Sequence, residues 1–221
     1  MGLDVYVGSL TRYYLESPVA VVEQMARQQR VPYAVVRDHG DPMGASWLEP
    51  VTRAAVLAWR DGLGRQLGDR LDGPLDWDES PSGPWFTDKP GWDGYGGAVL
   101  LAAHAEHPAL PLPEHVSPDW PDDPAYLASM TPGPGSRFDQ VLIPELWLPC
   151  PFAFTFRTLD VTGQEVEVGS SPTLLGQLAA LRAEDAGDHG PLAPVARAGL
   201  AVLLRMAERS VRHRLPMKLD F

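Results

Sequence analysis

Two short runs of alternating residues, on either side of residue 160, constrain the fold more than any other feature. The first run has phenylalanine at every second position from Phe152 to Phe156, and the second alternates glutamate and valine from Glu165 to Val168. A period of two places one kind of side chain on each face of a strand. Thr162 and Gly163 lie between the runs and favour a turn. The pattern therefore predicts an antiparallel hairpin with one apolar face.

Shorter patterns predict further strands. Residues 3–7 alternate apolar with polar side chains, residues 33–37 (YAVVR) form an apolar run, and residues 84–87 (PWFT) are a candidate short strand. Residues 141–148 (VLIPELWL) are also apolar, but Pro144 cannot donate a ladder hydrogen bond, which favours an edge strand or a bulge. A helix between the first two strands would permit a parallel pair joined by a right-handed crossover.

Helices are expected where apolar residues recur every three or four positions. This spacing occurs over residues 16–30, 49–67, 94–104, 170–187 and 192–213. The second of these helices is expected to bury Ala54, Ala55, Ala58 and Trp59, and the fourth to bury Leu174, Leu178 and Leu181. Helices and strands are interspersed at the front of the chain and segregated at the back. We therefore expect a single α+β domain over residues 1–221, with a small mixed or antiparallel sheet that includes the C-terminal-half hairpin, packed by about five helices.

Two long connections separate these elements. Residues 68–97 are irregular, acidic and rich in tryptophan, and residues 107–139 are rich in proline. Loops of this length in a compact domain tend to carry function or to contain short elements of their own.

The composition indicates a soluble globular protein, because 44% of the residues are hydrophobic and 21% are charged. The longest apolar run, residues 98–103, is too short to cross a membrane, and the first residues show no pattern of a signal peptide. Cys150 is the single cysteine, so no intramolecular disulfide can form and a cytoplasmic location is expected. The absence of asparagine and the presence of only two lysines are typical of GC-rich bacterial coding sequences.

The formal net charge is −11, and it is unevenly distributed. From Arg197 onwards there are six Lys or Arg against two Asp or Glu, so the preceding residues carry a net −15. An acidic body repels the phosphates of nucleic acids and attracts a basic protein. We therefore expect a basic protein partner rather than a nucleic acid or a membrane.

The segment DKPGWDGYGG, residues 88–97, allows two interpretations. Backbone N–H groups of a glycine-rich turn before a helix could hold an anion, with Lys89 adding a positive charge. The segment lacks the spacing of known phosphate-binding loops, however, and Asp88 and Asp93 would repel a phosphate. In the other interpretation Asp93 caps the helix, the glycines permit the turn, and the neighbouring aromatic rings pack.

Histidines provide candidates for a metal or catalytic site. His104 and His107 are spaced to share one face of a helix, with His115 nearby, as zinc ligands often are. In the alternative interpretation His107 stabilises the end of the helix, since Pro108 follows it. His39 and His189 could form an acid–base pair, but each lies in an Asp-His-Gly triplet typical of a turn. No Gly-x-Ser-x-Gly signature occurs, and Cys150 is better explained as an apolar filler than as a nucleophile.

The aromatic and charged residues between positions 77 and 95 are the predicted ligand- or partner-binding surface: Trp77, Trp85, Asp88, Lys89, Trp92, Asp93 and Tyr95. Tryptophans in a loop either anchor it to the core or form an interaction surface with an acidic rim. The leading hypothesis is a non-enzymatic binding protein for a protein partner or a small polar ligand, most concretely an inhibitor or immunity-type protein. No cofactor and no metal are expected. The alternative is a hydrolase, metal-dependent or not, with a site around Asp93, His104 and His107.

Overall fold

The computed structural model describes residues 2–16, 52–80, 82–130, 136–184 and 192–220. Apart from its first residue, Glu16, the expected helix over 16–30 lies outside these residues. The strand expected over 33–37 and the crossover connection lie outside them as well. His39 and His189 also lie outside them, so the acid–base pair proposed from the sequence stays a prediction.

Six strands of the described chain form one mixed sheet in the order β2-β1-β6-β3-β5-β4. Their bounds are β1 (Asp4–Val7), β2 (Phe86–Asp88), β3 (Leu146–Leu148), β4 (Phe156–Leu159), β5 (Glu165–Ser170) and β6 (Met217–Asp220). Among the described strands, β3 and β5 are the parallel pair, and every other neighbouring pair is antiparallel. The last strand along the chain, β6, is inserted between β1 and β3.

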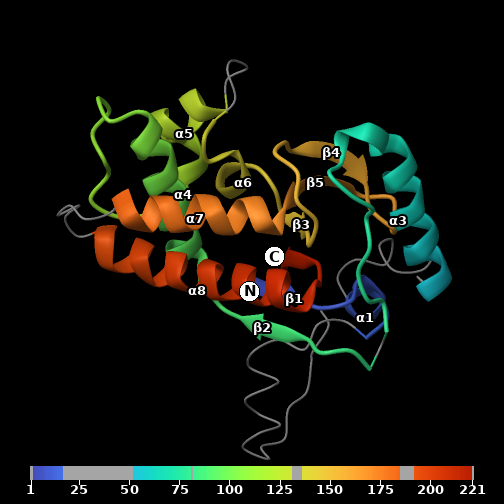
Figure 1. Ribbon diagram of the computed structural model, residues 1–221. Coiled ribbons are helices and arrows are strands. Elements are labelled where there is room, and N and C mark those ends of the chain that lie inside the picture. Colours follow the sequence, from blue (N-terminus) through green and yellow to red (C-terminus); the bar gives the residue numbers. More distant parts are fainter. Residues whose placement is uncertain (1, 17–51, 81, 131–135, 185–191, 221) are drawn as a thin grey trace, which may run out of the picture.

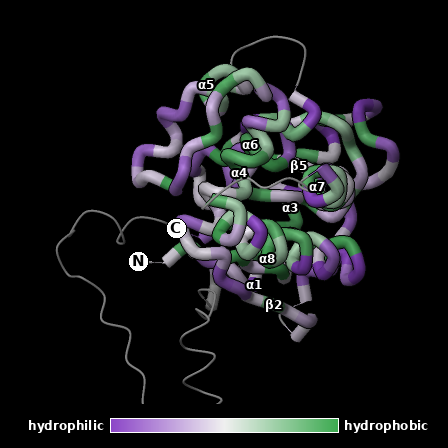
Figure 2. Tube along the Cα trace, turned by 90° about the vertical axis from the view of Figure 1, so that its left-hand side faces the viewer, coloured by the Kyte–Doolittle hydropathy of each residue, from purple (hydrophilic) through white to green (hydrophobic). Residues whose placement is uncertain are grey.

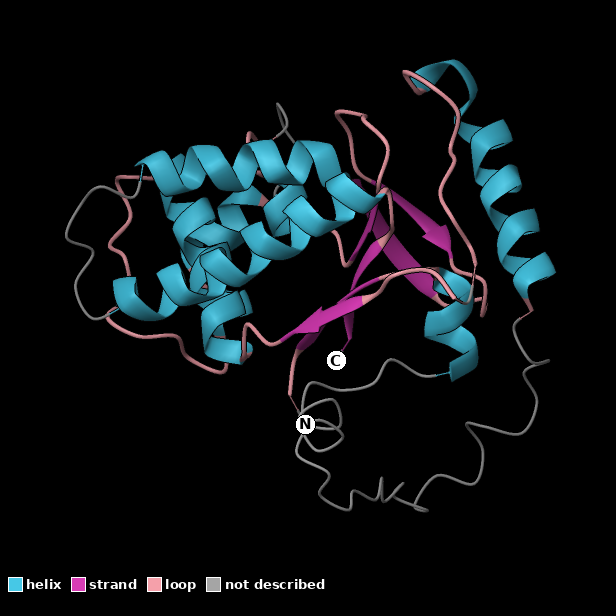
Figure 3. Ribbon diagram, turned by 60° about the horizontal axis from the view of Figure 1, so that its bottom comes forward, coloured by secondary structure: helices cyan, strands magenta, loops and turns pink. Residues whose placement is uncertain are grey.

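The described sheet is mixed and mostly antiparallel, and helices pack against it, so the fold class is α+β, as predicted. The described α-helices are α1 (Leu10–Glu16), α3 (Arg53–Leu67), α4 (Trp92–Glu106), α5 (Pro124–Ser129), α6 (Asp139–Leu142), α7 (Ser171–Glu184) and α8 (Leu192–His213), with 3₁₀ turns η1 (Gly68–Arg70) and η2 (Trp120–Asp122). Helices α4 to α8 lie on one side of the strands and α3 lies on the other (Figures 1 and 3). The helices that the sequence did not predict, α1, α5 and α6, are too short to produce a clear periodicity.

The strands send alternate side chains into two apolar clusters. Trp147 of β3 packs into the cluster formed with α4, α7 and α8, whereas its neighbours Leu146 and Leu148 pack into the cluster beneath α3. This is the alternation expected of a strand covered on both faces. Figure 2 shows hydrophobic segments towards the middle of the fold and hydrophilic segments mainly around its outside.

The C-terminal-half hairpin is confirmed as β4 and β5, with Gly163 at positive φ in the turn. The alternation that begins at Phe152 does not make a long strand, because β4 starts only at Phe156. The strand expected over residues 84–87 is present as the edge strand β2, but it begins at Phe86 and ends at Asp88. The edge placement of β3 is wrong: Pro144 precedes the strand, which lies inside the sheet between β6 and β5. Since the proline is outside the ladder, it removes no hydrogen bond from it.

The predicted buried stripe of α3 is wrong for its three alanines, whereas Trp59 is partly buried and packs against the cluster beneath the helix. Ala54, Ala55 and Ala58 are exposed, and the residues of this helix that are buried are Val56, Leu63 and Leu67. Leu63 and Leu67 follow Val56 by seven and eleven positions, so the three side chains share one face of the helix. Each of them removes more apolar surface from water on burial than an alanine side chain does.

The glycine cluster of residues 94–97 lies inside α4 rather than in a turn before it. The helix starts at Trp92, with Gly91 at its N-cap and at positive φ, so Asp93 does not cap it. Every residue from Gly94 to His104 is buried. A Cβ on Gly97 would come within 3.0 Å of the Cα of Ala196 in α8. The glycines therefore allow α4 and α8 to pack backbone against backbone.

Candidate functional site

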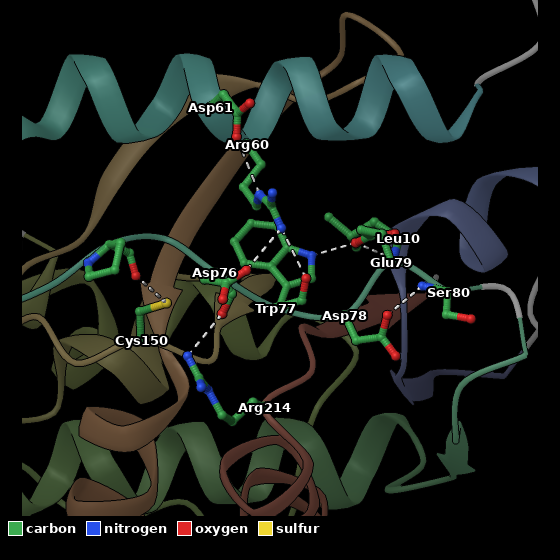
Figure 4. A network of polar contacts seen from close by, with 11 residues as sticks. Leu10, Arg60, Asp61, Asp76, Trp77, Asp78, Glu79, Ser80, Cys150 and Arg214 are labelled. Atoms are coloured by element: carbon green, nitrogen blue, oxygen red, sulfur yellow. Dashed lines mark hydrogen bonds and ion pairs between the residues drawn. The ribbon is translucent and has the colours of Figure 1, made fainter.

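Trp77 anchors the loop that follows α3 to the core. Only 4% of its surface is exposed, and its indole N–H donates to the carboxylate of Glu79 (Figure 4). The same carboxylate accepts the backbone N–H groups of Leu10, at 3.0 Å, and Thr11, at 2.7 Å. The Arg60 guanidinium lies 5.6 Å from the centre of the Trp77 ring. These contacts fit the interpretation in which the tryptophan holds the loop in place.

Asp88 and Lys89, at the end of β2, are engaged in ion pairs. Arg205 of α8 donates two hydrogen bonds to Asp88, at 2.6 and 3.0 Å, and Lys89 lies 3.2 Å from Asp4. Burial raises the pKa of Asp4, and the contact with Lys89 partly offsets that rise. Both predicted residues therefore connect β2 to neighbouring elements.

The remaining aromatic residues of the predicted surface do not gather in one place. The guanidinium of Arg12 lies 4.6 Å from the ring centre of Trp85. Trp92 is 44% exposed at the start of α4, whereas Tyr95, one turn later, is buried against Trp120. Asp93 is exposed. The seven predicted residues thus serve several local contacts, and Trp92 and Asp93 are the members that face solvent.

The histidines and Asp93 of the hydrolase hypothesis do not converge either. Asp93 lies in the first turn of α4 and His104 in the last, roughly 16 Å apart along the axis. His107 is the C-cap residue of the same helix, and His115 is exposed. His104 is buried and its Nε2 lies 3.1 Å from Asp123. Across the described parts of the chain, no three histidine, cysteine or acidic side chains are grouped to hold a metal ion.

A different polar pocket, which we call the tyrosine pocket, lies beside α1. It has a volume of about 380 Å³. Its described lining residues come from four places in the chain: Tyr13 and Tyr14 of α1, Glu145 before β3, Asp160 to Val166 in the hairpin, and Lys218 to Asp220 of β6. The two tyrosine rings meet edge to face, with centres 5.0 Å apart. The sheet order brings these segments together, because β6 lies between β1 and β3.

Both tyrosines of this pocket donate hydrogen bonds to carboxylates. The hydroxyl of Tyr13 lies 2.8 Å from Oδ1 of Asp220, and that of Tyr14 lies 2.7 Å from Oδ2 of Asp160. Burial, followed by the adjacent carboxylates, raises the pKa of each tyrosine well above its ordinary value. The hydroxyls therefore remain protonated donors.

The tyrosine pocket carries an excess of negative charge. Four carboxylates line it, those of Glu145, Asp160, Glu165 and Asp220, against one lysine, which is an excess of three among its described residues. That lysine, Lys218, has its ammonium 5.6 Å from the ring centre of Tyr13. No hydrogen bond or ion pair engages the carboxylate of Glu145 within the described structure. The arrangement suits a cationic group placed between carboxylates and aromatic rings.

This pocket was not predicted from the sequence. Its acids are separated by up to 75 positions, from Glu145 to Asp220, and its tyrosines lie on a helix too short to be predicted. The pair Tyr13–Tyr14 is the one local signal, and two adjacent tyrosines are not a motif.

Cys150 is buried, and burial raises the pKa of its thiol. None of the described helices combines the length and the apolar composition needed to cross a bilayer. No family model, curated protein or solved structure matches this chain.

Proposed function

We propose that the protein is a non-enzymatic binding protein whose tyrosine pocket receives a cationic side chain of a basic protein partner. The observation that carries this proposal is the excess of three negative charges in a concave site lined by Tyr13 and Tyr14. The inhibitor or immunity-type role expected from the composition is the most concrete form of it. A cytoplasmic location, supported by the single cysteine, belongs to the same proposal.

Arginine fits this pocket better than other cationic side chains. Its planar guanidinium stacks on aromatic rings and pairs with carboxylates at the same time. Glu145 supplies a carboxylate that has no partner of its own within the described structure. The carboxylate of Asp220, held at Oδ1 by the hydroxyl of Tyr13, keeps a fixed position for a second donor. Asp160 is already occupied by hydrogen bonds from Tyr14, Thr162 and Gln164.

The charge of the whole chain supports an encounter with such a partner. A net charge of −11 attracts a basic protein over distances comparable with the Debye length and raises the association rate. The tyrosine pocket would then provide the short-range contact that holds the two proteins in register.

The test uses Nα-acetyl-arginine amide, which carries a guanidinium and no other charge, with Nα-acetyl-norleucine amide as the neutral comparison. Titration followed by protein NMR should give saturable shifts for residues around Tyr14 with the first compound and none with the second. Glu145→Gln should weaken binding about fivefold, which matches the value of a partly exposed charge pair.

The matched control is Glu208→Gln, which makes the same charge change at an exposed position of α8. It should leave the affinity within about twofold. Equal weakening by both variants, or the absence of saturable shifts, would overturn the proposal, because either result would reduce the pocket to one part of a general acidic surface.

One observation favours the hydrolase hypothesis, but with a different set of residues at the site. His104 and Asp123 form a histidine–carboxylate pair, the arrangement that orients a general base in many hydrolases. A hydrolase would therefore use these two residues rather than Asp93 and His107. Hydrolysis of p-nitrophenyl acetate by the purified protein, abolished in a folded His104→Gln variant, would support it; equal rates for both proteins would exclude it.

A further inference from the structure

Lys218, the cation among the described lining residues of the tyrosine pocket, belongs to β6. Alternation along this strand places Met217 and Leu219 in the apolar cluster formed with α4, α7 and α8. Lys218 and Asp220 therefore point to the other face of the sheet, towards the pocket. The register of the sheet holds the lysine there, since Lys218 lies directly opposite Tyr6 of β1.

The ammonium of Lys218 lies over the ring of Tyr13. The distance from the ammonium to the ring centre is 5.6 Å, which is within the range of a cation–π contact. No hydrogen bond or ion pair joins this ammonium to a carboxylate within the described structure. The side chain is half-buried. It is therefore held by the ring and by the negative charge of the pocket as a whole, so another cation can displace it.

The other neighbours of the Tyr13 ring are fixed parts of the fold. The ring centres of Tyr6 and Tyr14 lie 5.3 and 5.0 Å away, and the hydroxyl of Tyr13 donates to Asp220. A ligand guanidinium that stacks on this ring would therefore take the place of the Lys218 ammonium rather than that of a ring or a carboxylate.

Binding without displacement is also unfavourable. A guanidinium that entered while the ammonium of Lys218 stayed in place would put two cations in a site of about 380 Å³. Like charges at such short range repel each other. Whether the ammonium leaves its ring or stays beside the ligand, it lowers the affinity of the pocket for a cationic group.

We infer that Lys218 is a built-in competitor of the tyrosine pocket, an internal cation that a ligand guanidinium has to displace from the ring of Tyr13. The inference rests on the proposed function of this pocket and specifies how the site is regulated. The affinity for a cationic side chain is limited by an intramolecular contact, and removal of the Lys218 ammonium raises that affinity.

Displacement can be observed directly, because the chain contains two lysines, Lys89 and Lys218. Protein labelled with ¹³C-lysine gives a separate ε-methylene NMR signal for each. The ring current of Tyr13 shifts the Lys218 signal, and saturation with Nα-acetyl-arginine amide should return it towards the ordinary position. Lys89, which pairs with Asp4 outside the pocket, is the internal reference and should not move. A Lys218 signal that stays in place while the pocket saturates would overturn the inference.

The second measurement is a gain of affinity, which a misfolded variant cannot produce. Lys218→Met removes the charge but keeps an unbranched side chain, and should bind Nα-acetyl-arginine amide about tenfold more tightly, equivalent to about 1.4 kcal/mol. Lys218→Arg keeps a cation at the ring and should stay within about twofold of the wild type. Arg182→Met makes the same charge change at an exposed position of α7 outside the pocket, and should also stay within about twofold.

The outcomes separate this inference from the proposed function. If the wild type binds and Lys218→Met binds equally or more weakly, the competitor role is overturned and the proposed function stands. Equal tightening by Arg182→Met would also overturn the competitor role, because the net charge of the chain would then be the cause. The absence of saturable binding by both the wild type and Lys218→Met would overturn both proposals.

Discussion

Gly199 of α8 lies against Gly94 of α4 so closely that a Cβ on Gly199 would come within 1.9 Å of the carbonyl oxygen of Gly94. The obstructing atom belongs to the backbone of a helix that is buried from Gly94 to His104, so it cannot move aside as a flexible side chain would. A second pair, Gly97 and Ala196, lies one turn further along the same contact. The distance between the two helices is therefore determined by residues without side-chain bulk.

Gly199→Ala should destabilise the protein by at least about 3 kcal/mol, because one added methyl group forces α4 and α8 apart along a well-packed contact. Urea unfolding followed by circular dichroism measures this loss. The control is Gly176→Ala in α7, where a Cβ would meet no atom within 4 Å. Since alanine is the better helix former, the control should be neutral or more stable by up to about 1 kcal/mol. Similar losses in both variants would contradict the close-packing account.

Glu79→Gln should lower the free energy of unfolding by about 2 kcal/mol. The carboxylate of Glu79 is 1% exposed and accepts hydrogen bonds from two backbone N–H groups and one indole. A glutamine amide would turn an N–H group towards one of these donors, which leaves a buried donor unpaired. The exposed neighbour Asp78, changed to asparagine, should cost only a few tenths of a kcal/mol in the same urea titration. Equal costs at both positions would show that the buried contacts contribute little.

The tyrosine hydroxyls predict a loss of stability in alkali. Burial raises the pKa of Tyr14 above the ordinary 10.0, so between about pH 10 and 12 the unfolded chain releases a proton that the folded chain retains. Stability from this group is fully present below pH 10 and falls above it, by at most about 1.4 kcal/mol per pH unit. Tyr14→Phe should therefore show a shallower decline of unfolding free energy with pH. Parallel curves for variant and wild type would argue against a raised pKa.

Cys150 should be unreactive in the folded protein, because its thiol is buried and burial raises its pKa. Labelling with 5,5′-dithiobis(2-nitrobenzoic acid) should be at least about 100-fold slower in buffer than in a denaturing concentration of urea. The urea sample should release one equivalent of thiolate per chain, which calibrates the assay. Rapid labelling in buffer would mean that the thiol is accessible.

Elements with a long or strongly periodic pattern were predictable from the sequence. Helix α8 was expected over residues 192–213 and has those bounds, and Leu174, Leu178 and Leu181 of α7 are buried as expected. The hairpin of β4 and β5 followed from its alternation. In each of these cases the element buries a single face. Its apolar residues therefore recur at the period of the helix or strand, and the pattern can be recognised from that element's residues alone.

Contacts between distant segments were not predictable in the same way. The glycines of α4 resembled a turn, since nothing near them in the sequence shows that Gly199 will lie opposite Gly94. The tyrosine pocket depends on the insertion of β6 beside β1, which places Asp220 next to Tyr13. The seven residues predicted as one surface are neighbours in the sequence, but the fold separates them. Some are buried, such as Trp77 and Tyr95, and others form ion pairs, such as Asp88. Trp92 and Asp93 face solvent at the start of α4.

The position of β6 also has a consequence for biosynthesis. Among the described strands, β6 is the last to be translated, and in the finished sheet it lies between β1 of the β2–β1 pair and β3 of the β3–β5–β4 group. If these two groups of strands pair before β6 is made, they are not yet joined. Each piece then presents an open edge whose backbone donors and acceptors can pair with another nascent chain. The sheet can therefore be completed only after β6 has been made.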